Sequence, residues 1–405
     1  MKLLHVTTVA ESFVFMRGQL AFMKERGFEI VGVTSPGPLV DAVREREGIE
    51  MYTVEMPRKI TPVQDLVALT ELTMRIREIG PDIVHGHTPK GGLLAMIAAT
   101  LAGVDRRVYH MRGLPMETAV GAKRALLATT ERISCGLATK VITVGRTMAE
   151  TAVQEGLCRR EKITYLAGGS SNGVDAVGRF NPENQPAGRR EEIRERYGIP
   201  ADAVVIGFLG RMVGDKGIVE LARAWMALRH KHSDLHLLLV GPFEERDAVD
   251  EEVRRRLRED PRVHMTGFVE DTAAHYVAMD VLTLPTHREG FPNAPLEGAA
   301  MGLAVVASDI GPCREAVADG ETGILHRVGD AGELQEALER YVCDRELRRS
   351  HGQAGRERVL KQFRPEQIWE GIYEVYREVL GESEEKEGRE NQRRRAMRFR
   401  SSQSR

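Results

Sequence analysis

Two cationic residues lie within a glycine-rich segment in the second half of the chain. The segment runs Gly207-Phe-Leu-Gly-Arg-Met-Val-Gly-Asp-Lys-Gly217, and it continues from an apolar run typical of a strand. Glycines let a phosphate approach the backbone, and the start of the helix expected near Gly217 favours an anion. Arg211 and Lys216 would add two positive charges there. The spacing matches neither the dinucleotide fingerprint nor the P-loop, so the alternatives are a different phosphate site or a charged surface turn.

The second strong feature is a pair of glutamates, Glu289 and Glu297, that follows a predicted strand. Residues 281–285 are typical of a strand, which puts Glu289 in the loop at its carboxyl end. Asn293 is the expected N-cap of the following helix and Pro295 suits its first turn, so Glu297 would lie about one turn inside. Such carboxylates could hold hydroxyl pairs of a sugar and a ribose while helix-start amides hold a diphosphate.

The elements that must position these residues alternate between strands and helices in both halves of the chain. The alternation predicts right-handed crossovers, parallel sheets and an α/β fold of two Rossmann-like, doubly wound domains facing a cleft. The predicted strands are residues 3–8, 29–34, 82–85, 107–111 and 140–144, then 204–209, 235–240, 263–268, 281–285 and 304–308. The predicted helices of the first half are residues 18–26, 66–79, 93–101 and 125–135.

Composition shifts indicate the domain boundaries. A segment rich in Gly, Asn, Pro and Arg has no apolar period and reads as an interdomain linker, and the last residues are charged and nearly free of apolar side chains. The predicted ranges are 1–177 for the first domain, 178–200 for the linker, 201–362 for the second domain, 363–381 for a helix packing back on the first domain, and 382–405 for a disordered tail. Basic clusters at 393–395 and 398–400 would be solvated or would touch anionic lipid.

Bulk composition restricts the class of protein. The net charge of −2 over 405 residues gives no global field that would recruit nucleic acid. Four cysteines lie far apart, which disfavours a disulfide framework or a zinc site and suits a reducing compartment. Residues 3–8 read as a buried strand and not a signal peptide, and the apolar run 91–104 is too short to span a bilayer. A cytoplasmic location is expected.

Beyond these patterns, the chain resembles the family-4 retaining glycosyltransferases over residues 1–376. The signature of that family is Glu-x7-Glu in the C-terminal domain, matched here by Glu289 and Glu297. The segments that carry the resemblance are Gly210-Arg211 with Lys216-Gly217, Leu239-Val240-Gly241, Thr266-Gly267-Phe268-Val269, Glu289-Gly-Phe-Pro with Glu297, and Gly311-Pro312 with Glu315. The resemblance implies a GT-B fold and a nucleotide diphosphate sugar as donor substrate.

The resemblance also implies roles on the donor side. Arg211 and Lys216 would bind the diphosphate and stabilise the departing nucleotide, Glu297 would hold the ribose, and Glu289 would hold sugar hydroxyls. The other donor-binding residues implied are Gly210, Phe268, Val269, Gly290, Phe291, Pro292, Asn293 and Ala294. The sequence has no Asp-x-Asp pair for a diphosphate-bound metal, so metal-independent transfer without a cofactor is expected.

On the acceptor side, the chain is similar to bacterial enzymes that extend lipid-diphosphate-linked or capsular glycans. The segments concerned are 84–92, 109–115 and 169–175, and the acceptor-side candidates are His87, Lys90, His110 and Asn172. Where many relatives end the strand 107–111 with His-Gly, this chain has Arg112, which would supply a fixed positive charge as a catalytic residue. Such enzymes imply a polyprenyl-diphosphate-linked or other glycan acceptor in the N-terminal domain.

Three features near the expected acceptor site leave alternatives open. His85 and His87 share one face of a strand, but a metal site needs a third ligand that the sequence does not reveal, so no metal is expected. Lys90 at a helix start would either meet an acceptor phosphate or be solvated. Residues 122–132 form a basic amphipathic helix that would be solvated or lie peripherally on the inner membrane leaflet.

The donor sugar is the least defined part of the expected reaction. A UDP-linked hexose or N-acetylhexosamine is preferred through the lipid-linked subgroup, with GDP-mannose as the main competitor. A sugar-nucleotide 2-epimerase of the same fold, or a non-catalytic scaffold that binds sugar nucleotides, are the alternative functions.

Overall fold

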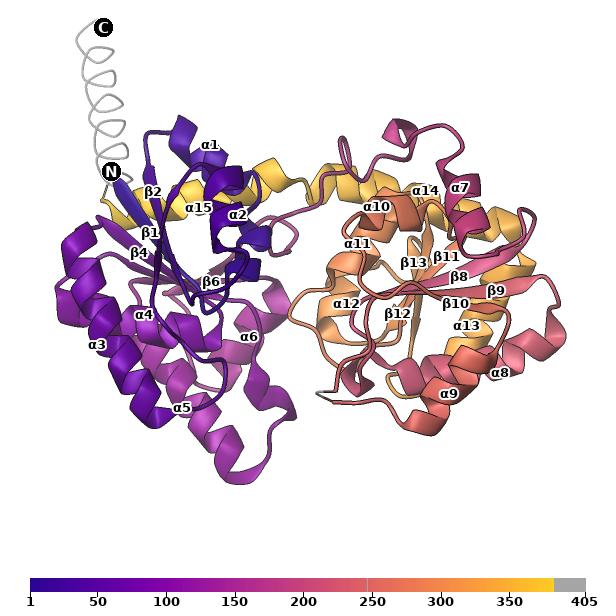
Figure 1. Cartoon of the computed structure of the whole chain (residues 1–405), viewed down its shortest axis with the longest axis horizontal. Coiled ribbons are helices and arrows are strands. Elements are labelled where there is room, and N and C mark those ends of the chain that lie inside the picture. Colours follow the sequence, from indigo (N-terminus) through magenta and orange to yellow (C-terminus); the bar gives the residue numbers. More distant parts are fainter. Residues whose placement is uncertain (246, 382–405) are drawn as a thin grey trace, which may run out of the picture. The chain divides into compact units, whose positions relative to one another are not determined.

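The computed structural model describes residues 1–245 and 247–381, which form two compact units (Figure 1). Unit 1 contains Met1–Val144, Ala149–Leu166 and the segment that begins at Glu366, and unit 2 contains Gly145–Met148 and Ala167–Pro365. The predicted disordered tail, 382–405 with its basic clusters, lies outside the described residues. None of the helices in the two described ranges is long and apolar enough to cross a membrane.

Unit 1 is built on a seven-stranded sheet in which all paired strands are parallel, with the order β3-β2-β1-β4-β5-β6-β7. The strands are β1 (Lys2–Val6), β2 (Glu29–Thr34), β3 (Glu50–Thr53), β4 (Ile83–His87), β5 (Arg107–Met111), β6 (Lys140–Thr143) and β7 (Ile163–Tyr165). The helices are η1 (Ala10–Met16), α1 (Gln19–Glu25), α2 (Val40–Glu47), α3 (Pro62–Ile79), α4 (Pro89–Ala102), η2 (Pro115–Thr118), α5 (Gly121–Leu137), α6 (Arg146–Gln154, which begins in unit 2) and α15 (Pro365–Val379).

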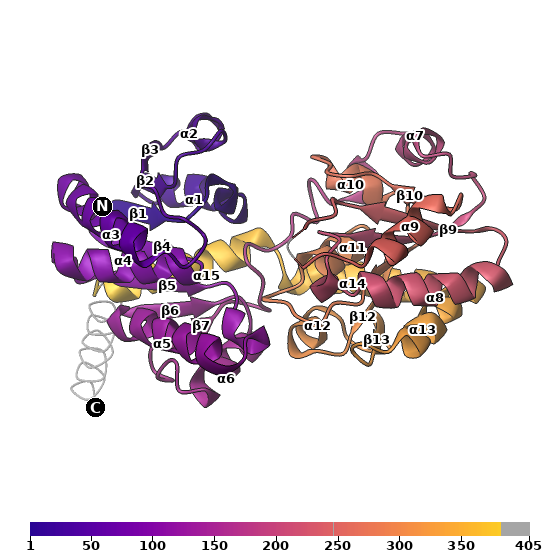
Figure 2. The same ribbon diagram turned by 60° about the horizontal axis from the view of Figure 1, so that its bottom comes forward.

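The helices of unit 1 cover both faces of this sheet. Helices α3, α4 and α5 lie side by side on one face, and α15 packs against the other (Figures 1 and 2). Ile368, Ile372 and Tyr376 of α15 are buried in the same cluster as Leu3 of β1 and Phe13 of η1. Helix α15 is therefore part of the core of unit 1.

Unit 2 contains a second parallel sheet of six strands, with the order β10-β9-β8-β11-β12-β13. Its strands are β8 (Val204–Leu209), β9 (Leu235–Val240), β10 (Val263–Met265), β11 (Val281–Leu284), β12 (Ala304–Ser308) and β13 (Gly323–His326). Its helices are η3 (Pro182–Asn184), α7 (Arg189–Arg196), η4 (Gly214–Lys216), α8 (Ile218–Lys231), α9 (Glu251–Glu259), α10 (Thr272–Tyr276), α11 (Asn293–Ala300), α12 (Gly311–Ala316), α13 (Ala331–Cys343) and α14 (Arg345–Gln362).

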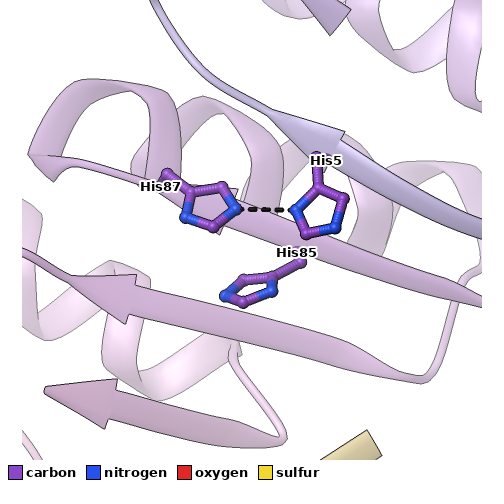
Figure 3. A group of neighbouring side chains, drawn as sticks. All are labelled: His5, His85 and His87. Carbon is purple, nitrogen blue, oxygen red and sulfur yellow. Dashed lines mark hydrogen bonds between the residues drawn. The ribbon is translucent and has the colours of Figure 1, made fainter. Parts of the chain in front are cut away.

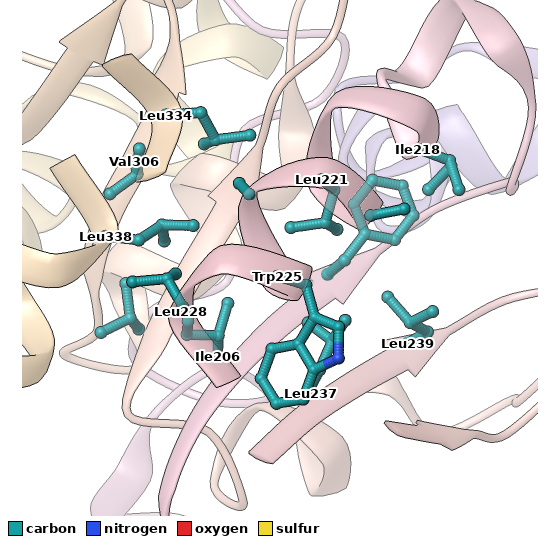
Figure 4. Close-up of a cluster of buried hydrophobic side chains, with 14 of the residues drawn as sticks. Ile206, Ile218, Leu221, Trp225, Leu228, Leu237, Leu239, Val306, Leu334 and Leu338 are labelled. Atoms are coloured by element: carbon teal, nitrogen blue, oxygen red, sulfur yellow. The ribbon is translucent and has the colours of Figure 1, made fainter. Parts of the chain in front are cut away.

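Apolar side chains of the central strands and of α8 and α13 fill the core of unit 2. Trp225 of α8 is 1% exposed and lies among Leu237, Leu239 and other residues of this cluster (Figure 4). The order of strands reverses at β8, which pairs with β9 on one side and β11 on the other. In open parallel sheets, this reversal point is where ligands bind beyond the carboxyl ends of the strands.

The segment 178–200 differs from the predicted linker, because it folds onto unit 2. Helix α7 occupies part of it, and Arg194 is only 2% exposed. The Arg194 guanidinium donates to the carbonyl of Ala278 at 3.0 Å and to the Asp280 carboxylate at 2.9 Å. A segment without an apolar period is thus held by buried hydrogen bonds and an ion pair.

Candidate functional site

The loops after β8 and β11 meet beyond the carboxyl ends of these two central strands of the sheet in unit 2. The two strands are neighbours and parallel, so the loops that follow them leave the sheet at the same end. Gly217, with φ of +71°, closes the first loop, and a Cβ atom there would overlap the carbonyl oxygen of Pro285. Only glycine allows this approach of the two loops.

Two cross-loop ion pairs join these segments. Lys216 of the first loop pairs with Glu289 of the second, and their side chains are 17% and 12% exposed. Beside them, Arg288 donates to Asp215 at 2.8 Å, and this hydrogen bond holds the pKa of Asp215 below its usual range. The structure thus brings together Lys216 and Glu289, two residues that the sequence predicts to act on one ligand.

Glu297 lies inside helix α11, as predicted, and has an unexpected partner. The Tyr276 hydroxyl of α10, which is fully buried, donates to Glu297 Oε2 at 2.9 Å. Burial raises the pKa of Glu297 to about 7, although the Tyr276 hydrogen bond and the charge of Arg179 oppose the shift. Tyr276 carries no motif of its own, so only the fold reveals it beside the carboxylate.

The start of helix α11 differs in one respect from the sequence prediction. Asn293 is the first helical residue and Pro292 occupies the cap position, so the predicted N-cap role of Asn293 is wrong. No described residue bonds to the buried Asn293 Oδ1. The first amides of a helix have no partner within the helix, so those of Asn293 and Ala294 can receive an anion.

Arg211 and the 268–269 segment flank this edge. Arg211 pairs with Glu244 at 3.0 Å, and its side chain remains 56% exposed. Phe268 is 78% exposed and Val269 is half-buried, whereas Gly210 adopts a φ of +153°. An exposed cation and an exposed aromatic ring at this edge are accessible to a ligand.

Phe291 differs from its neighbours because its ring is used for packing. It is 7% exposed, lies 6.2 Å from the Phe363 ring, and contacts the backbone around Gly169 so closely that a Cβ there would overlap the ring. Gly290 and Pro292 complete the loop on either side. Phe291 therefore sets the shape of the loop rather than offering its side chain.

In unit 1, the sequence-predicted residues of β4 and β5 do meet. His87 ends β4, His110 lies opposite it on β5, and their ring centroids are 5.6 Å apart. Arg112 Nη2 lies 3.4 Å from His87 Nδ1, and burial lowers the pKa of Arg112 to about 9, so it stays charged at neutral pH. His87 Nε2 bonds to His5 Nδ1 at 2.8 Å. His87 thus contacts other side chains of unit 1.

Lys90 and Asn172 lie in different environments from the expected ones. Lys90 pairs with Asp65 at 2.6 Å, with its side chain 18% exposed, so it is not the solvated lysine of the simpler alternative. Asn172 belongs to unit 2, whereas the predicted first domain, residues 1–177, includes it. Its backbone amide approaches Ser170 Oγ at 3.4 Å, within a tight glycine-rich turn.

Comparison with known proteins gives matches in both units. A family model for group 1 glycosyl transferases matches residues 203–344, and one for a glycosyl transferase 4-like domain matches residues 14–169. The chain is 32% identical over 386 residues to the capsular polysaccharide biosynthesis glycosyltransferase CapM of Staphylococcus aureus, covering 95% of this chain and 99% of that protein.

Two further relatives extend the comparison. The Escherichia coli UDP-Gal:alpha-D-GlcNAc-diphosphoundecaprenol alpha-1,3-galactosyltransferase is 26% identical over 314 residues, which cover 77% of this chain and 79% of that enzyme. The crystal structure of Anabaena HepE in complex with UDP and glucose superposes with a TM-score of 0.77 at 20% identity, over 93% of this chain and 99% of that one. At this identity, the structural likeness concerns the fold.

Proposed function

The chain belongs to the family of group 1, family-4 glycosyltransferases with the GT-B fold, and from its membership among enzymes of polysaccharide biosynthesis we propose a specific reaction. In this proposal, it transfers a hexose or N-acetylhexosamine from a UDP-sugar to a glycan carried on a lipid diphosphate, with retention of the anomeric configuration. The family establishes that the enzyme is a glycosyltransferase, and we propose its donor, its acceptor and its stereochemistry.

The paired Lys216 and Glu289 at the carboxyl edge of β8 and β11 carry the donor-side proposal. The ion pair holds the Lys216 ammonium in place before a donor arrives, so little reorganisation is needed when a diphosphate binds. In the proposed complex, Lys216 and Arg211 neutralise the diphosphate and the amides of Asn293 and Ala294 add hydrogen bonds. Glu289 accepts hydrogen bonds from donor-sugar hydroxyls, and Glu297 from the ribose.

Charge on the leaving diphosphate governs the proposed mechanism. As the bond between the anomeric carbon and the phosphate oxygen breaks, negative charge grows on that oxygen, and the fixed cations stabilise it. The sequence offers no evident enzymic nucleophile, which supports front-face attack with the departing phosphate taking the acceptor's proton. It also lacks an Asp-x-Asp motif, which supports transfer without a diphosphate-bound metal.

On the acceptor side, the proposal assigns Arg112 to catalysis and His87, His110, Lys90 and Asn172 to acceptor binding. Arg112 keeps its charge at neutral pH despite burial, as a fixed cation must. Lys90 already forms an ion pair with Asp65, so an acceptor phosphate would have to compete with that carboxylate for the lysine. The names of relatives that act on lipid-linked and capsular glycans support such an acceptor.

Contact with the inner membrane leaflet through α5 completes the proposal. The helix exposes Lys123 together with Leu126 (47%) and Ile133 (41%), and Val120 just before its start is 83% exposed, which suits an anionic interface. Arg124 is paired with Glu155 at 2.7 Å, so part of the basic charge is already neutralised. The contact would place the enzyme at a lipid-linked acceptor from the cytoplasmic side.

Thermal-shift binding of UDP, GDP, UDP-GlcNAc, UDP-GalNAc and GDP-mannose tests the donor proposal. A ligand at about 100 times its dissociation constant adds about 2.7 kcal/mol of apparent stability. We expect a shift with uridine ligands that is lost in Lys216→Met. The matched control is Lys231→Met, which removes another ion-paired lysine of unit 2, at the far end of α8. A melting shift with guanosine ligands alone would show that the donor nucleotide is GDP and not UDP. No shift with any of these ligands would overturn the proposed donor site.

Turnover distinguishes the transferase from its two rivals. A sugar-nucleotide 2-epimerase would convert the UDP-sugar without any acceptor, and a non-catalytic scaffold would bind it without conversion. We expect acceptor-dependent release of UDP, with little release when the acceptor is omitted.

A further inference from the structure

Four buried histidines lie on one face of the sheet in unit 1. His5 of β1 is opposite His85 of β4, and His87 of β4 is opposite His110 of β5. Because His85 and His87 are two residues apart on a strand, they share a face, and the parallel register brings the other two to it. Each of the four side chains is at most 1% exposed.

Three of these rings converge on one point. His5, His85 and His87 each offer a ring nitrogen, and the three nitrogens lie within 4.8 Å of one another (Figure 3). His5 and His87 share a hydrogen bond, and the rings of His85 and His87 stack with centroids 4.1 Å apart. His5 is the third ligand that the spacing of His85 and His87 alone did not reveal.

Several ring nitrogens of this group have no protein partner. Among the described residues, nothing bonds to Nε2 of His5, to Nε2 of His85 or to either ring nitrogen of His110. Buried polar atoms are normally paired, so such a group calls for a ligand. Burial lowers the pKa of all four imidazoles, that of His5 to about 3, which keeps the rings in the neutral form that binds metals.

We propose that His5, His85 and His87 bind one divalent transition-metal ion of the zinc type. Neutral imidazoles are ligands that Zn²⁺ and Co²⁺ prefer, and three of them with an open fourth position form a common tetrahedral set. At metal–nitrogen distances of about 2.0–2.1 Å, such nitrogens lie about 3.3 Å apart, so the three rings need only small movements. The His110 ring stacks on that of His85 with centroids 5.5 Å apart and is a further imidazole beside these three.

Tyr376 supplies the outer support that metal-binding histidines require. Its hydroxyl lies 2.6 Å from His85 Nδ1, which fixes the ring and directs Nε2, the unpartnered nitrogen, to the ion. Tyr376 is fully buried on α15. The ion would therefore link β1, β4 and the C-terminal helix, which makes it a structural element of unit 1.

Arg112 opposes the ion and provides a test of its location. Its guanidinium lies 3.4 Å from His87 Nδ1, so its charge repels a cation bound at His87 Nε2. The variant Arg112→Gln removes this repulsion and keeps a polar side chain. Tighter metal binding in this variant is expected only if the ion lies at this cluster.

The experiment measures metal content and cobalt absorption of the full chain without an affinity tag. Protein produced in medium supplemented with Zn²⁺ or Co²⁺ is dialysed and analysed by elemental mass spectrometry, and Co²⁺ protein is examined for the visible bands of a tetrahedral site. We expect one ion per chain in the wild type. Tyr376→Phe should lower the affinity about 10- to 100-fold, His5→Gln should lower it further, and Arg112→Gln should raise it.

The second stacked histidine pair of the chain is the matched control. His236 and His264 of β9 and β10 bond at 2.9 Å with ring centroids 5.2 Å apart, and no third ligand joins them in the part of the chain that the structure describes. His236→Gln should leave the metal content unchanged. Metal-free wild-type protein, or equal metal in wild type and His5→Gln, would overturn the proposal. UDP binding measured on the same samples, in unit 2, keeps this result separate from the donor assignment.

Discussion

Replacing Glu297 by glutamine should stabilise the protein at alkaline pH and weaken donor binding. In the folded protein burial raises the pKa of Glu297 to about 7, compared with 4.5 for a solvent-exposed glutamate. Below pH 4.5 the carboxyl is protonated in both folded and unfolded chains. As the pH rises from 4.5 to 7, the unfolded chain loses the proton first, so this group's contribution to stability falls and is fully lost above pH 7.

The size of the effect follows from the shift. The difference between pKa values of 4.5 and about 7 corresponds to a loss of at most about 3 kcal/mol above pH 7. Glutamine has no proton to lose and can still accept the Tyr276 hydrogen bond. Glu297→Gln should therefore melt several degrees higher than wild type at pH 8, since each kcal/mol corresponds to about 2–4 °C in a domain of this size. The two proteins should melt alike near pH 4.5.

Glu131 offers a matched control in unit 1. It is 2% exposed, accepts a hydrogen bond from the buried Tyr109 hydroxyl at 2.8 Å, and burial raises its pKa to about 7. Glu131→Gln should raise the melting temperature with the same pH dependence and leave UDP binding intact. Glu297→Gln should lower UDP affinity about 10- to 100-fold, because a hydrogen bond to a charged group contributes about 1.5–3 kcal/mol.

The assay is a melting curve from pH 4.5 to 8 for the three proteins, with and without UDP. Equal melting of Glu297→Gln and wild type at pH 8 would refute the account of the buried carboxyl. Unchanged UDP protection in Glu297→Gln would refute the ribose role and leave the stability argument in place.

Three further predictions concern the cation Lys216, the close approach of Gly217 to Pro285, and the membrane contact of α5. Lys216→Ala should lower kcat about 10²- to 10³-fold, the loss typical of removing one group that stabilises a transition-state charge, whereas an unchanged kcat would exclude Lys216 from that role. Gly217→Ala should lower the free energy of unfolding by well over the roughly 1–3 kcal/mol that backbone strain alone costs, because the new Cβ meets Pro285. Gly320→Ala, at a φ of +72° with open space around it, introduces the strain alone. Equal melting temperatures of the two variants would contradict the packing argument. Lys123→Gln should weaken sedimentation with anionic liposomes at low salt by about 1 kcal/mol, or about fivefold, with Lys231→Gln as control, and a wild type that does not sediment would remove the membrane contact.

The sequence predicts the sheets best where strands are buried on both faces. Strands β8, β9 and β12 begin and end at the predicted residues, because parallel strands covered by helices read as continuous apolar runs. Strand β3 was not predicted, since Glu50 and Thr53 of this short edge strand are exposed. The sequence does not predict helix α7, because its buried Arg194 is held by hydrogen bonds to backbone carbonyls, and the segment has no apolar periodicity that would indicate a helix.

The candidate site shows the same division. Lys216 and Glu289 were predicted together because each follows a recognisable strand in a loop of distinctive residues. Tyr276 and His5 were not, because each reads locally as an ordinary core residue, and only the register of β1 with β4 and the packing of α10 beside α11 reveal their partners. Non-local pairing is thus what sequence reasoning could not supply.

Transfer of a sugar in the presence of a chelator is the decisive test of the proposed reaction. Purified enzyme, EDTA, a UDP-hexose or UDP-N-acetylhexosamine and a lipid-diphosphate-linked glycan are incubated, and the product is analysed by mass spectrometry and by the anomeric NMR coupling of the new linkage. We expect the addition of one sugar residue with the anomeric configuration of the donor, and loss of product in Lys216→Ala. An inverted linkage would contradict the retaining mechanism, and conversion of the UDP-sugar without acceptor would contradict transfer itself.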